Sequence, residues 1–366
     1  MEKQHYYWLD SLRFIAAFLV LLCHAHYDFF MPWSDLPESY HVSHVFALYS
    51  LGRLGHEAVI VFFLLSGFLV GGRGLEKIHQ GSFNVASYSV DRFSRIFPPL
   101  AMAIVFYFVT CLILGNDFNY LCAVGNLFCL QGVCCEPLLA PFWSLSYEVW
   151  FYIALAGIGL IFSKSNKKRV LGLLLTIVVS GIFMSGLSFH YLALWLIGAA
   201  AYLTKPSRRN NFALVFAIIG TFVGIILWQM SAYPTTMSLP FKIENTKLIE
   251  LFLAMMVGIL IQQLILFEPK RKFSRLIEHK LGQLAKFSYT LYLSHKTVLM
   301  LLFAFVFKKS SGTPGFRGMI QYIALLLITL AFCWCLYLVS ERFTPQIKKY
   351  MKAKLNIEPV QRIPQL

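Results

Sequence analysis

A few ionisable side chains interrupt long apolar runs of this sequence, where a charge is costly unless it faces a partner or water. In the first run, Arg13 and His24 are eleven positions apart. Eleven positions make about three turns of an α-helix, so both side chains fall on one stripe, roughly 16 Å apart along the axis. An imidazole can accept and return a proton near neutral pH, and a guanidinium can stabilise developing negative charge. The pair is therefore a candidate for acid–base chemistry.

Two further runs carry titratable groups near their expected outer ends. Glu148 lies about six residues, or roughly 9 Å, inside its run, which is nearly the depth expected of His24. We expect Glu148 to meet His24 and to orient the imidazole or stabilise the imidazolium. Single histidines near helix ends are more often satisfied interfacial residues, and for His56 that alternative stays open. The residues expected to line the substrate site are His56, Glu57, Trp143 and Ser146.

The composition indicates that lipid surrounds the elements that carry these residues. Of 366 residues, 58% are hydrophobic and only 13% are charged, which is outside the range of soluble domains. Apolar runs of about 17 to 25 residues recur, each long enough to cross a hydrocarbon layer of roughly 30 Å. The ten expected spans are 9–30, 46–72, 96–115, 142–163, 169–186, 189–204, 211–231, 247–267, 284–307 and 318–340. The sequence thus predicts an all-α, polytopic membrane helix bundle.

The formal charge of +15 is distributed unevenly over the connections. Most lysines and arginines outside the spans lie in the loops after the second, fourth, sixth and eighth spans and near the C-terminus. By the positive-inside rule, both termini are expected to be cytoplasmic. Topology thus explains most of the basic excess, attraction of a polyanionic cytosolic ligand stays open as a second role, and no nucleic-acid partner is expected. We expect one transmembrane domain over 1–345 and a cytoplasmic tail over 346–366, which is solvated or lies on anionic lipid.

Three features leave alternatives open. The stretch 73–95 is basic and carries aromatic residues, so it is expected to lie along the inner interface before the chain re-enters the membrane. His295 and Lys296 stand in the ninth span, where a structural salt bridge and a role in chemistry are both plausible. Four cysteines cluster in or beside one outer loop, where a disulfide is possible but no metal-site spacing is present. These are Cys122, Cys129, Cys134 and Cys135.

Six motifs, taken together, resemble the acyltransferase-3 family of integral membrane acyltransferases. They occur in the family's order and span residues 9 to 345. The matching segments are LDSLRFIAAFLVLLCHAH (9–26), GRLGHEAVIVFFLLSGFLV (52–70), DRFSRIFPPL (91–100), FWSLSYEVWFY (142–152), SYTLYLSHKTV (288–298) and SERFTP (340–345). One departure is Lys296, where many relatives have an aromatic residue.

The resemblance implies an acyl-CoA donor, usually acetyl-CoA, and an acceptor hydroxyl that is commonly on a glycan. Arg92 and Arg95 are then expected to bind the donor phosphates, since guanidinium groups pair well with phosphate, although positive-inside anchoring explains them equally well. His24 would act as general base or form an acyl-histidine, with Arg13 orienting the donor or stabilising the thioester oxygen. No metal is expected.

The resemblance also implies a bacterial inner-membrane protein. Its expected partners are membrane lipids, a glycan or glycolipid acceptor and the machinery that assembles surface polysaccharides. Two other functions stay open from the residues alone. The first is a polysaccharide or glycolipid transporter. The sequence shows neither a repeated half nor a pair of matching broken helices, which argues against it. The second is an acyltransferase that acts on a small-molecule acceptor.

Overall fold

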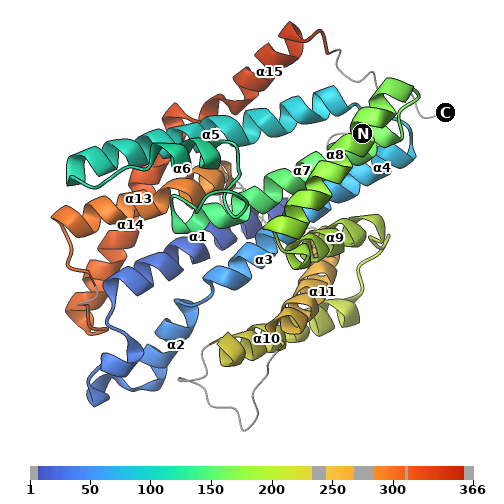
Figure 1. Cartoon of the computed structure of the whole chain (residues 1–366). Coiled ribbons are helices and arrows are strands. Elements are labelled where there is room, and N and C mark those ends of the chain that lie inside the picture. Colours follow the sequence, from blue (N-terminus) through green and yellow to red (C-terminus); the bar gives the residue numbers. More distant parts are fainter. Residues whose placement is uncertain (1–6, 233–244, 268–282, 310–311, 358–366) are drawn as a thin grey trace.

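The computed structural model describes residues 7–232, 245–267, 283–309 and 312–357, and within them the chain is helical with no strand (Figure 1). A helix lies at each of the ten predicted spans. The longer helices are α1 (Tyr7–Phe29), α3 (Gly55–Ser66), α5 (Val85–Leu114), α7 (Trp143–Ile161), α8 (Asn166–Ser185), α9 (Phe189–Leu203), α10 (Asn211–Ala232), α11 (Thr246–Leu264), α13 (Ser288–Phe305), α14 (Phe316–Val339) and α15 (Thr344–Lys354). The shorter ones are α2 (Ser43–Leu51), α4 (Arg73–His79) and α6 (Tyr120–Leu127).

Eight of the described helical segments are long and apolar enough to cross a membrane. The outer helices α8 and α10 show why lipid is needed: only 17% of the apolar window of each is buried, against 61% in the segment Gly55–His79. Their exposed side chains include Leu174, Ile177, Phe216 and Ile219. An apolar surface of this extent would be costly in water, so the chain is a multi-pass membrane protein. Cytoplasmic termini and ten crossings stay predictions.

The second predicted span, 46–72, is broken. Helix α2 ends at Leu51 and α3 begins at Gly55, and the chain then continues through a π-helical segment, η3 (Gly67–Gly72), into α4. Helix α9 packs closely on this segment, because a Cβ atom at Gly67 would lie 2.0 Å from the carbonyl oxygen of Trp195. Only glycine allows two backbones to approach so closely. The polar side chains of α3 and α4 therefore have fixed positions within the bundle.

Helix α5 begins at Val85, well before the predicted start at residue 96. The side chain of Asn84 caps its first turn by accepting a hydrogen bond of 3.0 Å from the backbone N–H of Ser87. The first part of the stretch 73–95 is therefore α4 and its last part is α5. As a consequence, Arg92 and Arg95 are carried on the second and third turns of a long helix. The position of the stretch along the interface stays a prediction.

Helix α15 lies along the first part of α5 (Figure 1). Lys348 and Lys352 of α15 both pair with Asp91 of α5, at 3.0 and 2.7 Å. Through Lys354, then, the predicted tail is a helix that packs against α5 with none of its residues buried.

The segment between α6 and α7 folds inward over the start of α7. The carbonyl oxygen of Cys129 accepts hydrogen bonds from Ser146 Oγ at 2.9 Å and Trp150 Nε1 at 3.0 Å. All eight cysteines are free thiols, so the possible disulfide in this segment is not formed. The first turns of helix α7 are therefore covered by this segment, and Ser144, Leu145, Ser146 and Tyr147 are buried.

Candidate functional site

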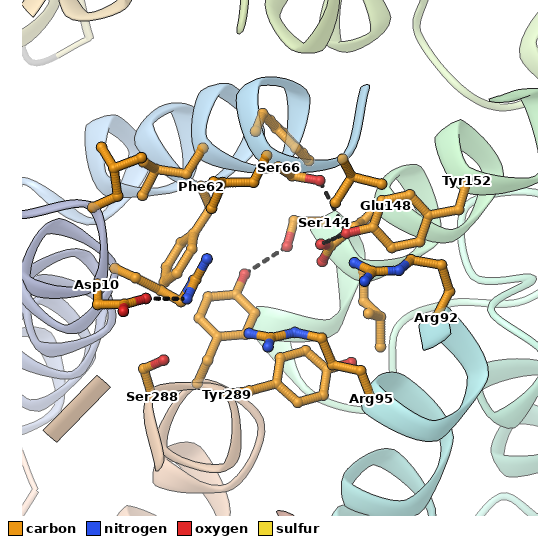
Figure 2. A pocket seen from close by; sticks show the side chains of 18 of the residues that line it. Asp10, Phe62, Ser66, Arg92, Arg95, Ser144, Glu148, Tyr152, Ser288 and Tyr289 are labelled. Atoms are coloured by element: carbon orange, nitrogen blue, oxygen red, sulfur yellow. Dashed lines mark hydrogen bonds and ion pairs between the residues drawn. The ribbon is translucent and has the colours of Figure 1, made fainter. Parts of the chain in front are cut away.

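A cavity of about 570 Å³ lies between α1, α3, α5, α7 and α13. Its charged lining consists of four arginines and two carboxylates, so positive charge is in excess. These residues are Arg13, Arg73, Arg92, Arg95, Asp10 and Glu148. Hydroxyl groups of serine and tyrosine supply most of the remaining polar lining. Figure 2 shows Arg92 and Arg95 reaching in from one side, with Glu148 and Tyr152 beside Arg92. We call this cavity the arginine pocket.

The two carboxylates in the arginine pocket already have partners. Asp10 pairs with Arg13 at 2.9 Å, one turn along α1. Glu148 accepts a hydrogen bond from the hydroxyl of Tyr152, whose oxygen also lies 3.0 Å from Ser66 Oγ. The guanidinium of Arg92 lies over the Tyr152 ring, 5.5 Å from its centroid. Its Nε atom is buried and has no hydrogen-bond partner among the described residues. The pocket thus offers donors to a bound anion.

A layer of aromatic and hydroxyl side chains, which we call the closing layer, lies at one end of the arginine pocket. The hydroxyl of Tyr292 donates a hydrogen bond of 2.9 Å to the carbonyl of Pro141. The hydroxyl of Ser144 lies 2.6 Å from the Tyr292 oxygen and donates to it, because the Tyr292 proton is already used. The ring of Phe62 packs edge-on against Tyr292, with centroids 5.3 Å apart. Beyond this layer is the ring of His295, 6.5 Å from that of Tyr292. The side chain of Tyr292 therefore separates a ligand in the pocket from His295.

His24 lies on the far side of this layer and does not line the arginine pocket. Its ring packs beside that of His295, with centroids 5.2 Å apart and planes at 33°. The expected meeting of His24 with Glu148 is therefore not what the structure shows. Glu148 instead lines the pocket together with Arg13, and its partner there is the hydroxyl of Tyr152. His24 and Arg13 both lie on α1, as predicted, but on opposite sides of the closing layer: Arg13 lines the pocket and His24 does not.

Lys296, which follows His295 in α13, forms a salt bridge of 2.5 Å with Asp28 of α1. Asp28 is four residues after His24, so the ion pair lies one helical turn beyond the two histidines. This decides the open question about Lys296 in favour of a salt bridge. The bridge neutralises a cation close to the histidines and ties α1 to α13 next to them.

One of the expected substrate-site residues, His56, belongs to a separate polar group, the Glu250 cluster, which we define as His56, His190 and Glu250; a second, Trp143, lies beside it. Glu250 Oε1 lies 2.9 Å from His56 Nε2, and Oε2 lies 2.6 Å from His190 Nε2. The His56 ring stacks on Trp228, with centroids 4.4 Å apart, and lies parallel to Trp143 at 6.4 Å. Neither His56 nor Trp143 lines the arginine pocket.

The other two expected substrate-site residues are also bonded within the bundle. Glu57 accepts a hydrogen bond of 2.5 Å from Gln229 Nε2, next to the Glu250 cluster. Ser146 is fully buried, and its hydroxyl bonds the Cys129 carbonyl. Burial raises the pKa of Cys129 to about 12, with a further contribution from the charge of Glu148, so this thiol stays protonated and is not a nucleophile. The structure thus gives these residues packing partners in place of a cavity.

Sequence reasoning therefore found four of the six charged residues of the arginine pocket as candidates: Arg13, Arg92, Arg95 and Glu148. It did not single out Arg73, the pocket tyrosines, or His190 and Glu250. For Glu250 a signal was present, because it is an ionisable residue inside an apolar span. No group of histidine, cysteine and acidic residues that would hold a metal is found among the described residues.

Comparison with known proteins adds a family match to this geometry. A family model described as an acyltransferase domain matches residues 6–338, which include every residue of the arginine pocket. An uncharacterized protein of Haemophilus influenzae is 36% identical over 63 residues, covering 17% of this chain and 26% of that protein. The chain thus spans about a quarter of the curated relative that it matches. No solved structure matches significantly.

Proposed function

The chain belongs to the acyltransferase-3 family, and we propose that it moves an acyl group, by default acetyl, from acyl-CoA to a hydroxyl of a cell-surface saccharide or its lipid-linked precursor. The site of action is a bacterial inner membrane, with the donor taken from the cytosol. Membrane lipids and the machinery that assembles surface polysaccharides are its proposed partners.

The arginine pocket is the observation that supports this proposal best. Coenzyme A carries a diphosphate and a further phosphate, and guanidinium groups pair with phosphate oxygens through two parallel hydrogen bonds. Four arginines against two carboxylates give the cavity lining an excess of positive charge, which a polyanion would neutralise. The closing layer at Tyr292 and Phe62 lies between the pocket and His24. The thin pantetheine arm of the donor is what we expect to pass this layer and to present the thioester beyond it.

Within this proposal the catalytic roles fall into two layers. His24 acts on the acceptor hydroxyl as general base, or receives the acyl group itself. Arg13, Arg92 and Arg95 hold the donor, while Glu148 and Tyr152 keep the arginine pocket in shape. Glu148 has this role in place of orienting His24.

Donor binding is tested by calorimetry with coenzyme A, which binds but has no acyl group to transfer. The double change Arg92→Ala and Arg95→Ala should raise the Kd about 100-fold, since it removes two charge-assisted contacts. The matched control is Arg208→Ala with Arg209→Ala, which removes two arginines that do not line the pocket and should leave the Kd within about twofold. An unchanged Kd in the pocket variant would reduce Arg92 and Arg95 to topological anchors.

The reaction itself is tested by mass spectrometry of surface glycans from cells that lack the gene and are complemented by wild type or by His24→Ala. An acyl increment that appears only with wild type would establish transfer and identify the acceptor. Purified protein incubated with labelled acetyl-CoA and the isolated glycan then separates an enzyme from a transporter, which consumes no donor. The absence of any acyl difference among the strains would contradict a surface saccharide as acceptor.

A further inference from the structure

His295 carries a buried nitrogen whose role the fold does not explain. The residue is fully buried on α13, and its Nδ1 lies 2.9 Å from the carbonyl oxygen of Leu291. A carbonyl only accepts hydrogen bonds, so Nδ1 must carry the proton, and in the neutral ring Nε2 then holds a lone pair. Nε2 is buried and has no hydrogen-bond partner among the described residues. An orphaned acceptor of this kind is rare in a packed interior and calls for an explanation.

The neighbouring ring is that of His24, whose role in the proposed reaction requires one free lone pair. Their centroids are 5.2 Å apart, and α1 and α13 pack directly against each other. The nearby cation, Lys296, is paired with Asp28 at 2.5 Å. Lys309 also approaches Asp28, at 3.7 Å. Because the His295 ring is fully buried and no carboxylate is bonded to it among the described residues, the ring is neutral and its Nε2 remains an acceptor.

We infer that His295 is a positioning residue for His24. This inference rests on the proposed function. In the proposed arrangement the His24 ring turns so that its N–H donates to Nε2 of His295, and this hydrogen bond fixes the tautomer of His24. The other His24 nitrogen is left with its lone pair toward the acceptor hydroxyl. Catalytic bases are commonly oriented by a third group in this way, and here the orienting group is a neutral imidazole that the Leu291 carbonyl fixes in turn.

The transfer step balances with these two residues. The lone pair of His24 takes the proton of the acceptor hydroxyl as its oxygen bonds to the acyl carbon. The carbon–sulfur bond then breaks, and the sulfur leaves with the bonding pair. The proton passes from His24 to that sulfur, so the products are an ester and coenzyme A. The hydrogen bond to His295 persists throughout, and His295 gains or loses no proton.

The first test compares steady-state kinetics of wild type, His295→Gln and His26→Gln. His26 is a matched control, because it is a buried histidine of α1 whose Nδ1 also lacks a partner among the described residues, but it packs on Tyr49. We expect His295→Gln to lower kcat about 100-fold with the KM for donor and acceptor unchanged, and His26→Gln to stay within about threefold. Because the two histidines act as a unit, adding His295→Gln to His24→Gln should cause no further loss.

The second test needs no turnover. Diethyl pyrocarbonate attaches to the lone pair of a neutral imidazole, and mass spectrometry of the digest gives the rate at His24. That rate should fall at least about fivefold in His295→Gln or, if this variant does not fold, in His295→Asn, and should not change in His26→Gln.

Wild-type kcat in folded His295→Gln, or an unchanged labelling rate at His24, would overturn the inference. The two proposals can fail separately. If wild type transfers and His24→Gln does not, but His295→Gln is normal, only the positioning role is lost. If wild type itself transfers nothing, the proposed function fails and the labelling rate alone decides whether the histidines are coupled.

Discussion

The arginine pocket and the Glu250 cluster both place charged or titratable side chains within the bundle, but they differ in how those side chains are paired. In the Glu250 cluster, one carboxylate is shared by two imidazoles at 2.9 and 2.6 Å. In the pocket, four arginines face two carboxylates across a cavity of about 570 Å³. The first is a self-contained set of hydrogen bonds, and the second lines a cavity with more arginines than carboxylates. An ionisable residue in a span therefore indicates ligand binding only where its charge is left over and a cavity adjoins it.

The largest effect on stability is expected from Glu250→Leu. The change leaves His56 and His190 without the acceptor that both use, and an unsatisfied buried polar group costs about 1–3 kcal/mol. We expect the free energy of unfolding to fall by about 2–4 kcal/mol, while the Kd for coenzyme A stays within about twofold. Thermal unfolding in detergent and calorimetry measure the two quantities. Equal losses of stability and donor affinity would mean that the two regions are not separate.

Arg92→Met should show the reverse pattern. Arg92 lines the cavity, and its Nε has no partner among the described residues, so its removal breaks no protein hydrogen bond at that atom. We expect the Kd for coenzyme A to rise about tenfold, or about 1.4 kcal/mol, with no decrease in the thermal midpoint. A variant that unfolds at clearly lower temperature would show that Arg92 is structural.

The helices and the identities of most pocket charges could be predicted from the sequence, because apolar length and rare charges are local signals. Which helices are neighbours, and at what depth a helix begins, could not. The sequence predicts Glu148 beside His24 on the assumption that α7 starts at the surface, whereas the Cys129 carbonyl accepts hydrogen bonds from Ser146 and Trp150, so chain covers that start. Likewise, nothing in the sequence pairs His190 with Glu250, which lie 60 positions apart.

A smaller effect is expected from His190→Gln, because an amide can still donate to Glu250. The loss should be about 1 kcal/mol, with donor affinity unchanged. A double-mutant cycle of Glu250→Gln and His190→Gln should give a coupling of about 1–2 kcal/mol. Additive losses would mean that the 2.6 Å contact contributes nothing specific.

The smallest effect is expected from Asp91→Asn, at the part-exposed contact between α5 and α15. Surface ion pairs contribute about 0–1 kcal/mol and weaken with salt. We expect a loss of about 0.5 kcal/mol at low ionic strength that disappears at high salt. A salt-independent loss would place Asp91 among buried charges such as Glu250.

The π-helical segment η3 determines the directions in which the side chains of helix α4 point around the helix axis. Arg73 comes directly after Gly67–Gly72, and it is the only arginine that α4 contributes to the pocket lining. A residue in an α-helix takes up about 100° of rotation, and a π segment holds one more residue per turn than the α-helix around it. Loss of a single glycine there would let the helix wind regularly and would turn Arg73 by about 100°, away from the pocket wall. The length of this glycine segment is therefore as much a part of the site as the charges are.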